Sequence, residues 1–215
     1  MPSTKIKKLF EQIKPLYARR SKEILFHGWH HILFVRNKAL FFSKSVNANK
    51  LIVEAAALTH DINYIVKPNS EPEIGKKLRQ KLLSKAGFTF EEKNMIEKVI
   101  LEAHTRTRIR KISPEGMALS DADTLFKALP ITPIVLAQKY LLQNKVDLLK
   151  LARKITAEQN PLMKKNIYFY TAYAKKEYLH WAKVNLMLWN NVVEALKDKD
   201  VRNILQIVNQ LKINK

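Results

Sequence analysis

Apolar side chains recur three or four positions apart along almost the whole chain, which is the spacing of one face of an α-helix. The chain has only 4 glycines and 8 prolines in 215 residues, whereas a sheet-rich protein of this length needs many tight turns. Both observations predict an all-α protein. In chain order, the pattern predicts helices at residues 4–18, 21–44, 47–60, 72–86, 89–104 and 113–130, and three or four more from residue 132 onwards.

Polar residues, glycine and proline mark the expected helix ends. Thr89 and Glu92 have the spacing of a capping box, Gly87 suits the end of the preceding helix, and Pro114 suits a first helical position. Asn47 can cap the third helix. We predict loops at residues 61–70 and 105–111, and breaks between the later helices near residue 144, at residues 160–161 and at residues 197–200.

Composition limits the class of protein. The chain has no cysteine, which excludes disulfides and thiolate metal sites and favours a reducing compartment, so we expect a cytoplasmic protein. Residues 1–20 are basic but lack the apolar core of a secretory signal. The longest stretch almost free of charge, residues 128–140, is too short to span a bilayer and contains two prolines, so we expect a soluble protein without a transmembrane segment. No segment is rich enough in Pro, Gly or Ser to divide residues 1–215, so we predict a single domain.

The charge is strongly unbalanced, with 39 Lys and Arg against 19 Asp and Glu and a net charge of +20. Such a field favours polyanionic partners such as nucleotides, nucleic acid or an anionic membrane. A lysine-rich, solvated surface explains the same number, so the charge alone chooses no partner.

Histidines and aspartates gather at a few positions that suit metal chemistry. Three of the six histidines lie in HGWHH (residues 27–31), and His60–Asp61 ends a predicted helix. Imidazoles and carboxylates are the ligands that a divalent transition metal takes when no thiolate is present. Asp121 and Asp123 lie on one later helix and point about 200° apart, so only one of them can reach such a metal, and periodicity does not choose between them.

These motifs together resemble the HD superfamily of metal-dependent phosphohydrolases. HGWHHILFV (27–35) resembles the first-histidine motif, AAALTHDI (55–62) the segment ending in the His-Asp pair, residues 73–104 the next two helices, and SDADTL (120–125) the final motif. The resemblance covers about residues 20–130 and says little about residues 140–215. It implies an HD-type helical bundle with a core at about 20–130 and additional C-terminal helices at about 131–215.

Carried over position by position, the resemblance implies that His31, His60, Asp61 and Asp123 hold one divalent metal ion, with Asp123 preferred to Asp121. Mn, Fe, Co, Ni, Zn and Mg are all compatible, although nitrogen ligands disfavour Mg alone. The expected reaction is hydrolysis of a phosphate ester of a nucleotide or related small molecule by metal-activated water.

The remaining roles follow from that chemistry. Asp61 and Asp121 are the expected proton acceptors for the attacking water, and His104 can donate to a leaving oxygen or simply pack. Basic residues after His104 suit phosphate binding, with a solvated loop as the alternative. The residues expected to bind substrate are His27, Arg106, Arg108 and Lys127.

The sequence departs from the common family pattern at three positions and leaves two other functions open. Phe34 replaces an arginine, Asn63 a glycine, and Tyr64 a lysine or glutamate. No histidine lies near Glu71 in the sequence, which favours a mononuclear site and argues against cyclic-dinucleotide phosphodiesterase activity. The alternative is a basic helical module that binds nucleic acid or an acidic partner, with a non-catalytic HD site. A weaker one is a membrane-surface protein, based on amphipathic helices at residues 4–18 and 199–213.

Overall fold

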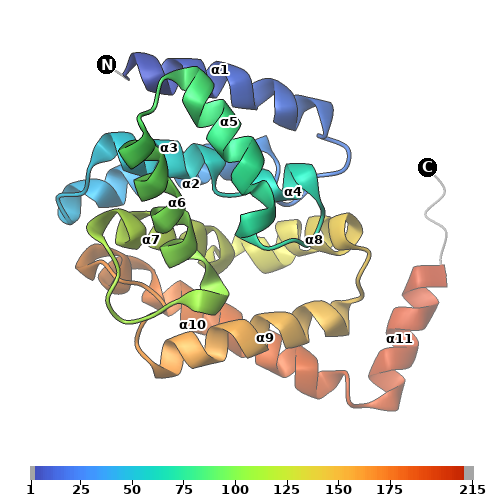
Figure 1. The fold of residues 1–215 in the computed structure, drawn as a ribbon. Helices are drawn as coiled ribbons and strands as arrows, with labels where there is room; N and C mark the ends of the chain where they lie inside the picture. The colour runs from blue at the N-terminus through green and yellow to red at the C-terminus, as the bar shows by residue number, and fades with distance from the viewer. Residues whose placement is uncertain (1–2, 211–215) are drawn as a thin grey trace.

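The computed structural model of the protein describes residues 3–210, and over that range it consists of helices and connecting segments without a strand (Figure 1). The predicted all-α class is confirmed. The helices are α1 (Thr4–Arg19), α2 (Trp29–Ser45), α3 (Lys50–Thr59), α4 (Ile62–Val66), η1 (Pro72–Gly75), α5 (Lys76–Ala86), α6 (Phe90–Ala103), η2 (Thr105–Thr107), α7 (Pro114–Ala128), η3 (Thr132–Leu136), α8 (Ala137–Asn144), α9 (Leu148–Lys164), α10 (Ala172–Ala195) and α11 (Lys199–Gln210).

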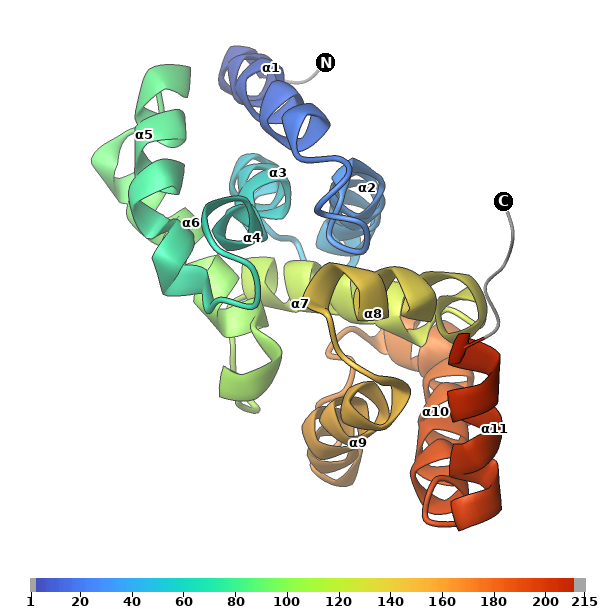
Figure 2. The same ribbon diagram turned by 90° about the vertical axis from the view of Figure 1, so that its right-hand side faces the viewer.

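Helix α7 lies at the centre of the molecule. It packs against α2, α3 and α6 on one side and against α10 on the other. Figure 2 shows α7 and α8 running between a layer that contains α1, α2 and α3 and a second layer that contains α9 and α10. Helix α3 is apolar on nearly all faces, and every residue from Ile52 to Thr59 is buried, as expected of a helix surrounded by other helices.

Several predicted helix ends are confirmed. Thr89 and Glu92 form the capping box of α6, because each side chain accepts from the backbone N–H of the other residue. Gly87 ends α5 with a φ of 89°, a left-handed conformation that glycine adopts at little cost. The side chain of Ser113 caps α7 just before Pro114.

Other predicted boundaries are wrong. Helix α2 begins at Trp29 rather than near residue 21, so His27 lies in the preceding segment and not on its helical face. The predicted loop at 61–70 contains α4, and α3 is capped by Asn49 instead of Asn47. Helix α9 runs through Pro161 without a break, although proline removes one helical hydrogen bond, and the adjacent Leu162 is buried.

The C-terminal helices differ in how much of their apolar surface is covered. Helices α9 and α10 pack against each other, whereas α11 leaves Ile204 and Ile207 exposed. Helix α11 covers the predicted amphipathic segment as far as residue 210, and residues 211–213 of that prediction lie outside the described part of the chain. Within residues 3–210 no single helix is both long and apolar enough to cross a membrane, although α7 and the segment Thr132–Asn144, which meet at 70°, satisfy both criteria together.

Candidate metal and substrate site

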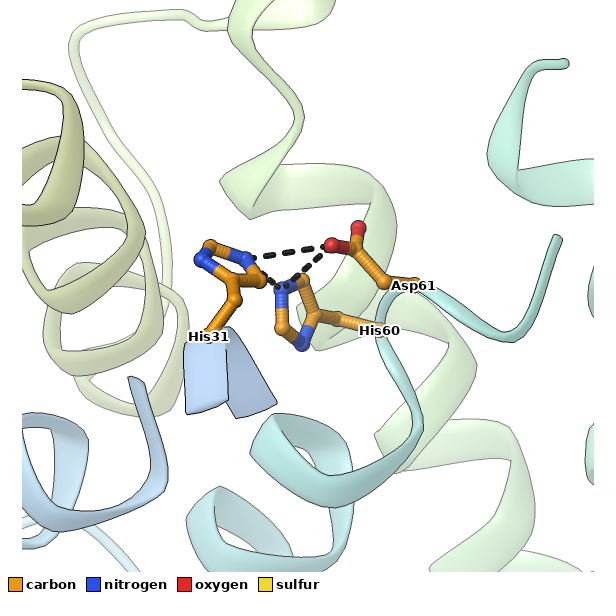
Figure 3. Close-up of side chains that lie close together, drawn as sticks. All are labelled: His31, His60 and Asp61. Carbon is orange, nitrogen blue, oxygen red and sulfur yellow. Dashed lines mark hydrogen bonds and ion pairs between the residues drawn. The ribbon is translucent and has the colours of Figure 1, made fainter. Parts of the chain in front are cut away.

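Three helices bring the four predicted metal ligands to one place. His31 comes from the first turn of α2, His60 and Asp61 follow the last residue of α3, and Asp123 comes from α7. The Nε2 atoms of His31 and His60 are 3.1 Å apart. Asp61 Oδ2 lies 3.1 Å from His31 Nε2 and 3.4 Å from His60 Nε2. Figure 3 shows the side chains of His31, His60 and Asp61 pointing toward one another.

The end of α3 orients two neighbouring side chains toward the same point. The backbone leaves the helical conformation at Asp61, which has φ −101° and ψ 15°, so its carboxylate does not follow the helical rotation away from His60. The Nδ1 atom of His60 lies 2.9 Å from the carbonyl oxygen of Ala57. When Nδ1–H donates to this carbonyl, the lone pair of Nε2 faces the other ligands, which is how metal-binding histidines are commonly held.

The donor set fits a divalent transition metal. Ligand atoms about 2.1 Å from one cation lie roughly 3.0–3.4 Å from one another at octahedral or tetrahedral angles, which is the range measured between the atoms of His31, His60 and Asp61. Asp61 Oδ2 is buried and contacts the two imidazole nitrogens at ion-pair distance, but it makes no hydrogen bond within residues 3–210. A buried carboxylate oxygen without a donor is costly, and a cation removes that cost.

Asp123 stands at the edge of this group. Its Oδ1 lies 3.5 Å from His31 Nε2, and its Oδ2 accepts from Lys127 Nζ over 2.7 Å. The lysine is one helical turn further along α7, so the pair is a short-range contact of the same helix. One carboxylate oxygen of Asp123 therefore remains available to the cluster.

The four side chains are coupled electrostatically. Burial disfavours the charged imidazolium of His60, but Asp61 and Asp123 outweigh it, and the pKa of His60 is raised above its ordinary value. Burial raises the pKa of the Asp61 carboxyl, yet the neighbouring imidazoles outweigh this effect and hold its pKa well below the usual range. For Asp123, burial is likewise outweighed by Lys127 and the histidines, and its pKa is also low. Both carboxylates are ionised at neutral pH.

A cavity of about 490 Å³ opens from this cluster. That volume suits a ligand of nucleotide size. One wall belongs to α3, α4, α6, α7 and the segments between them, and includes His60, Asp61, Tyr64, His104, Arg106, Asp123 and Lys127. The other wall belongs to the C-terminal helices and includes Tyr140, Lys145, Lys150, Lys154, Glu158 and Trp189.

His27 faces this cavity from the segment before α2. Its ring stacks on Tyr64 with centroids 3.8 Å apart, and its Nδ1 lies 2.7 Å from the side-chain nitrogen of Gln143. Burial lowers the pKa of His27 from 6.5 to about 3, so the ring is neutral at physiological pH. Because the amide of Gln143 donates to Nδ1, the N–H of the neutral ring is on Nε2.

His104, Arg106 and Lys127 also line the cavity. His104 Nε2 lies 3.3 Å from a carboxylate oxygen of Glu71, and the guanidinium of Arg106 pairs with the other oxygen. Arg106 also lies 3.5 Å from Glu158 of α9, so it connects the two walls. Burial lowers the pKa of His104, which leaves its imidazole neutral at pH 7.

Asp121 is not brought to the cavity, which corrects its assignment as a proton acceptor. Its two carboxylate oxygens accept from the backbone N–H groups of Tyr170 and Thr171 over 2.7 and 2.8 Å, just before α10. Burial raises the pKa of Asp121 to about 6 despite these hydrogen bonds. The side chain therefore attaches α7 to the start of α10, on the face of α7 turned away from Asp123.

Arg108 is also placed differently from the expectation that it binds substrate. Its guanidinium is buried and donates to the carbonyl oxygens of Ala103, Tyr168 and Ser120 over 3.2–3.3 Å, and to the hydroxyl of Thr124. The N–H groups of the Arg108 guanidinium are therefore engaged by buried acceptors, and Arg108 does not line the cavity. Arg108 joins α6, α7 and the segment before α10.

The three departures from the family pattern have local explanations. Phe34 packs against Phe126 with ring centroids 5.4 Å apart, so an apolar side chain at this position meets an apolar neighbour. The side-chain nitrogen of Asn63 donates to the carbonyl of Ser70 over 2.6 Å, which fixes the segment after α4. Tyr64 stacks on His27, as described above.

Sequence reasoning missed the wall formed by the C-terminal helices, because no motif lies there. Gln143 binds the backbone N–H groups of Phe26 and His27 through its Oε1 atom, at 2.8 and 3.2 Å. The one available signal was the four-residue spacing of Lys150, Lys154 and Glu158, which places them on one face of a helix. That spacing does not reveal what the face contacts.

Comparisons with known proteins agree with this architecture. The sequence profile of the HD domain family matches residues 28–127, the stretch that contains all four clustered side chains. A crystal structure of a Lactobacillus plantarum protein from a structural genomics programme superposes with a TM-score of 0.66 and 19% identity, covering 91% of this chain and 96% of the other. That likeness extends the shared fold to the C-terminal helices. No curated protein matches the sequence.

Proposed function

Because residues 28–127 match the HD domain family, whose members are generally metal-dependent phosphohydrolases, we propose that the protein hydrolyses a phosphate ester of a nucleotide or a related small phosphorylated molecule. The observation that carries the proposal is the convergence of His31, His60, Asp61 and Asp123 beside a cavity of about 490 Å³. Because the lack of cysteine suits a reducing compartment, we also propose that the protein is located in the cytoplasm.

The proposed cofactor is one divalent cation held by those four side chains, with Mn, Fe, Co, Ni and Zn more suited to the two imidazoles than Mg alone. A cation held there supplies Lewis acidity, which polarises the phosphoryl group and makes water a stronger nucleophile at neutral pH.

The protein's own side chains supply the remaining steps. Asp61 is itself a member of the cluster and is ionised, and we assign to its carboxylate the role of orienting the attacking water and accepting its proton. Lys127 and Arg106 bring positive charge to the same cavity and stabilise the charge on the phosphoryl oxygens. His104, neutral and next to Glu71, can donate a hydrogen bond from its ring N–H to the leaving oxygen.

Replacement of His60 by alanine tests the proposal. We expect His60→Ala to lose bound metal, measured by elemental analysis of the purified protein, and to lose phosphate release over a panel of nucleotides. Helix content should stay close to that of the wild type by circular dichroism. His180→Ala is the matched control, because His180 is exposed on α10 and lies outside the cavity. Unchanged metal content in His60→Ala would refute the metal site, and unchanged turnover would refute the reaction.

The net charge of +20 supports a second candidate function, binding of nucleic acid or another acidic partner by a non-catalytic protein. Binding of this kind weakens steeply as salt rises, because phosphate contacts release counterions. Steep salt dependence of RNA or DNA binding, together with purified protein that carries no metal and releases no phosphate, would favour it over the hydrolase.

A further inference from the structure

The wall formed by the C-terminal helices carries lysines that the proposed reaction does not use. Lys145 follows α8, and Lys150 and Lys154 lie one turn apart on α9. All three line the cavity that contains His60 and Asp61. They fall outside residues 28–127, the part of the chain that the HD profile matches.

Lys154 is held in place at this wall. Its Nζ donates to the hydroxyl of Tyr140 over 2.8 Å and lies 5.4 Å from the centre of the same ring. Both contacts orient the ammonium group without neutralising it. A side chain fixed before binding loses less conformational entropy when a ligand arrives.

Positive charge on this wall exceeds the negative charge that could neutralise it. Glu158 lies 4.0 Å from Lys154 and is shared with Arg106 at 3.5 Å. Asp147 caps α9 by accepting from the backbone N–H of Lys150 over 2.7 Å. Within residues 3–210, neither Lys145 nor Lys150 has an ion-pair partner.

The cations are therefore divided between two parts of one cavity. Lys127 and Arg106 belong to the wall that carries Asp61 and Asp123, and Lys127 contacts Asp123 directly. The lysines of α9 belong to the other wall. A substrate with one phosphate satisfies the first group and leaves the second without an anion.

We propose that Lys150 and Lys154, with Lys145 beside them, bind a second phosphoryl group of the substrate, so that the protein selects molecules with two or more phosphates. This proposal rests on the proposed function for the identity of the reacting phosphate. The second phosphate can belong to a linear di- or triphosphate chain or to a separate position of a bisphosphate. Both present anionic phosphoryl oxygens to the lysines, although an internal phosphate of a chain carries one negative charge and a separate phosphate monoester nearly two.

The test measures anion binding without the metal. The protein is treated with EDTA and titrated by calorimetry with tripolyphosphate, with fructose 1,6-bisphosphate and with inorganic phosphate. In the double variant Lys150→Gln/Lys154→Gln we expect affinity for at least one of the first two probes to fall about tenfold, through the loss of two charge-assisted contacts. The probe whose affinity falls identifies a linear or a separated arrangement.

Lys77→Gln/Lys81→Gln is the matched control, because these lysines have the same four-residue spacing on α5, are exposed and lie outside the cavity. It removes the same charge, and we expect its affinities to stay within about twofold of the wild type. An equal loss in both double variants would assign binding to the bulk charge and overturn the proposal. Wild-type protein that binds neither probe more tightly than inorganic phosphate would also overturn it.

These outcomes are separate from a failure of the proposed function. Binding in EDTA does not require the metal, whereas metal content and turnover of His60→Ala do not depend on the lysines of α9. Because Lys150 is exposed and Lys154 only half-buried, the double variant of these two lysines should fold, which a thermal unfolding curve checks.

Discussion

The side-chain amide of Gln143 donates to Nδ1 of His27 over 2.7 Å, joining residues 116 positions apart. The carbonyl oxygen of the same side chain accepts from the backbone N–H groups of Phe26 and His27. A residue of α8 thus fixes both the backbone and the ring of the first histidine of the HGWHH motif. The orientation of that ring toward the cavity depends on a helix outside the family match.

Replacement of Gln143 by alanine should therefore destabilise the protein. Three buried or half-buried polar groups lose their partner, and we expect the free energy of unfolding to fall by about 2–3 kcal/mol. Urea denaturation measures the change. Gln138→Ala is the control, since Gln138 is exposed on the same helix and should change stability by less than about 0.5 kcal/mol. Equal effects of the two substitutions would contradict the role of Gln143.

His27 should make the protein sensitive to acid. Its pKa falls from 6.5 to about 3 on folding, so the unfolded chain binds the proton more tightly. The stabilisation is fully present above the pKa of His27 in the unfolded chain and is lost as the pH falls toward its pKa in the folded protein. Between about pH 7 and pH 5 we expect the free energy of unfolding to fall by about 2 kcal/mol. His27→Phe keeps a ring beside Tyr64 but cannot titrate, so denaturation at both pH values should show a correspondingly smaller loss in the variant. Parallel losses would contradict this.

Arg106 and Arg108 should give opposite results although they are two residues apart. Arg106→Gln should raise KM for the best nucleotide substrate about three- to tenfold with little change in kcat, because it removes a contact made in ground state and transition state alike. Arg108→Gln should leave KM nearly unchanged and lower the free energy of unfolding by about 3 kcal/mol, because several buried carbonyls lose their donor. Steady-state kinetics and urea denaturation separate the two. A KM effect confined to Arg108→Gln would reverse the assignment.

Asp121→Asn should separate a structural role from a catalytic one. An amide presents one acceptor oxygen where two backbone N–H groups need acceptors, so we expect a loss of about 2 kcal/mol in the free energy of unfolding. Metal content should be unchanged, and kcat should change by less than about threefold, measured well below the melting temperature. A loss of kcat by several orders of magnitude in folded protein would restore Asp121 to the catalytic group.

Gly75→Ala should test the close packing of η1 against α4. An added Cβ would lie 2.7 Å from the backbone nitrogen of Asn63 and 2.8 Å from Nη1 of the buried Arg79. Neither neighbour is free to move, so we expect a loss of about 1–3 kcal/mol in the free energy of unfolding. Gly87→Ala is a useful comparison, because the Cβ meets nothing within 4 Å and only the φ of 89° is strained. A stabilised Gly75→Ala variant would contradict the packing argument.

Much of the fold was predictable because it depends on local patterns. The helical spacing of apolar residues predicts the all-α class, and Thr89, Glu92 and Gly87 mark helix ends through contacts within a few residues. The grouping of His31 and His60 was accessible only through the family resemblance, because their contact depends on how α2 and α3 pack. Periodicity places a side chain on a face but does not say what that face meets.

The errors have the same physical origin. Arg106 and Arg108 have the same charge and stand in one basic segment, yet Arg106 contacts carboxylates at the cavity and Arg108 contacts buried carbonyls. Asp121 and Asp123 were correctly expected to point in different directions, but the sequence did not predict that backbone N–H groups before α10 would take up the carboxylate of Asp121. Such partners are distant in the chain and carry no motif.

The attachment of Asp121 to the start of α10 has a practical consequence for anyone cutting or recombining this chain. The family match ends at residue 127, yet a fragment ending there would lack residues 170 and 171, whose backbone N–H groups donate to the carboxylate of Asp121. It would also uncover the face of α7 that α10 protects. The segment that the family profile matches is therefore shorter than the segment that completes the packing of α7. A chimaera or expression fragment should carry the chain at least through α10.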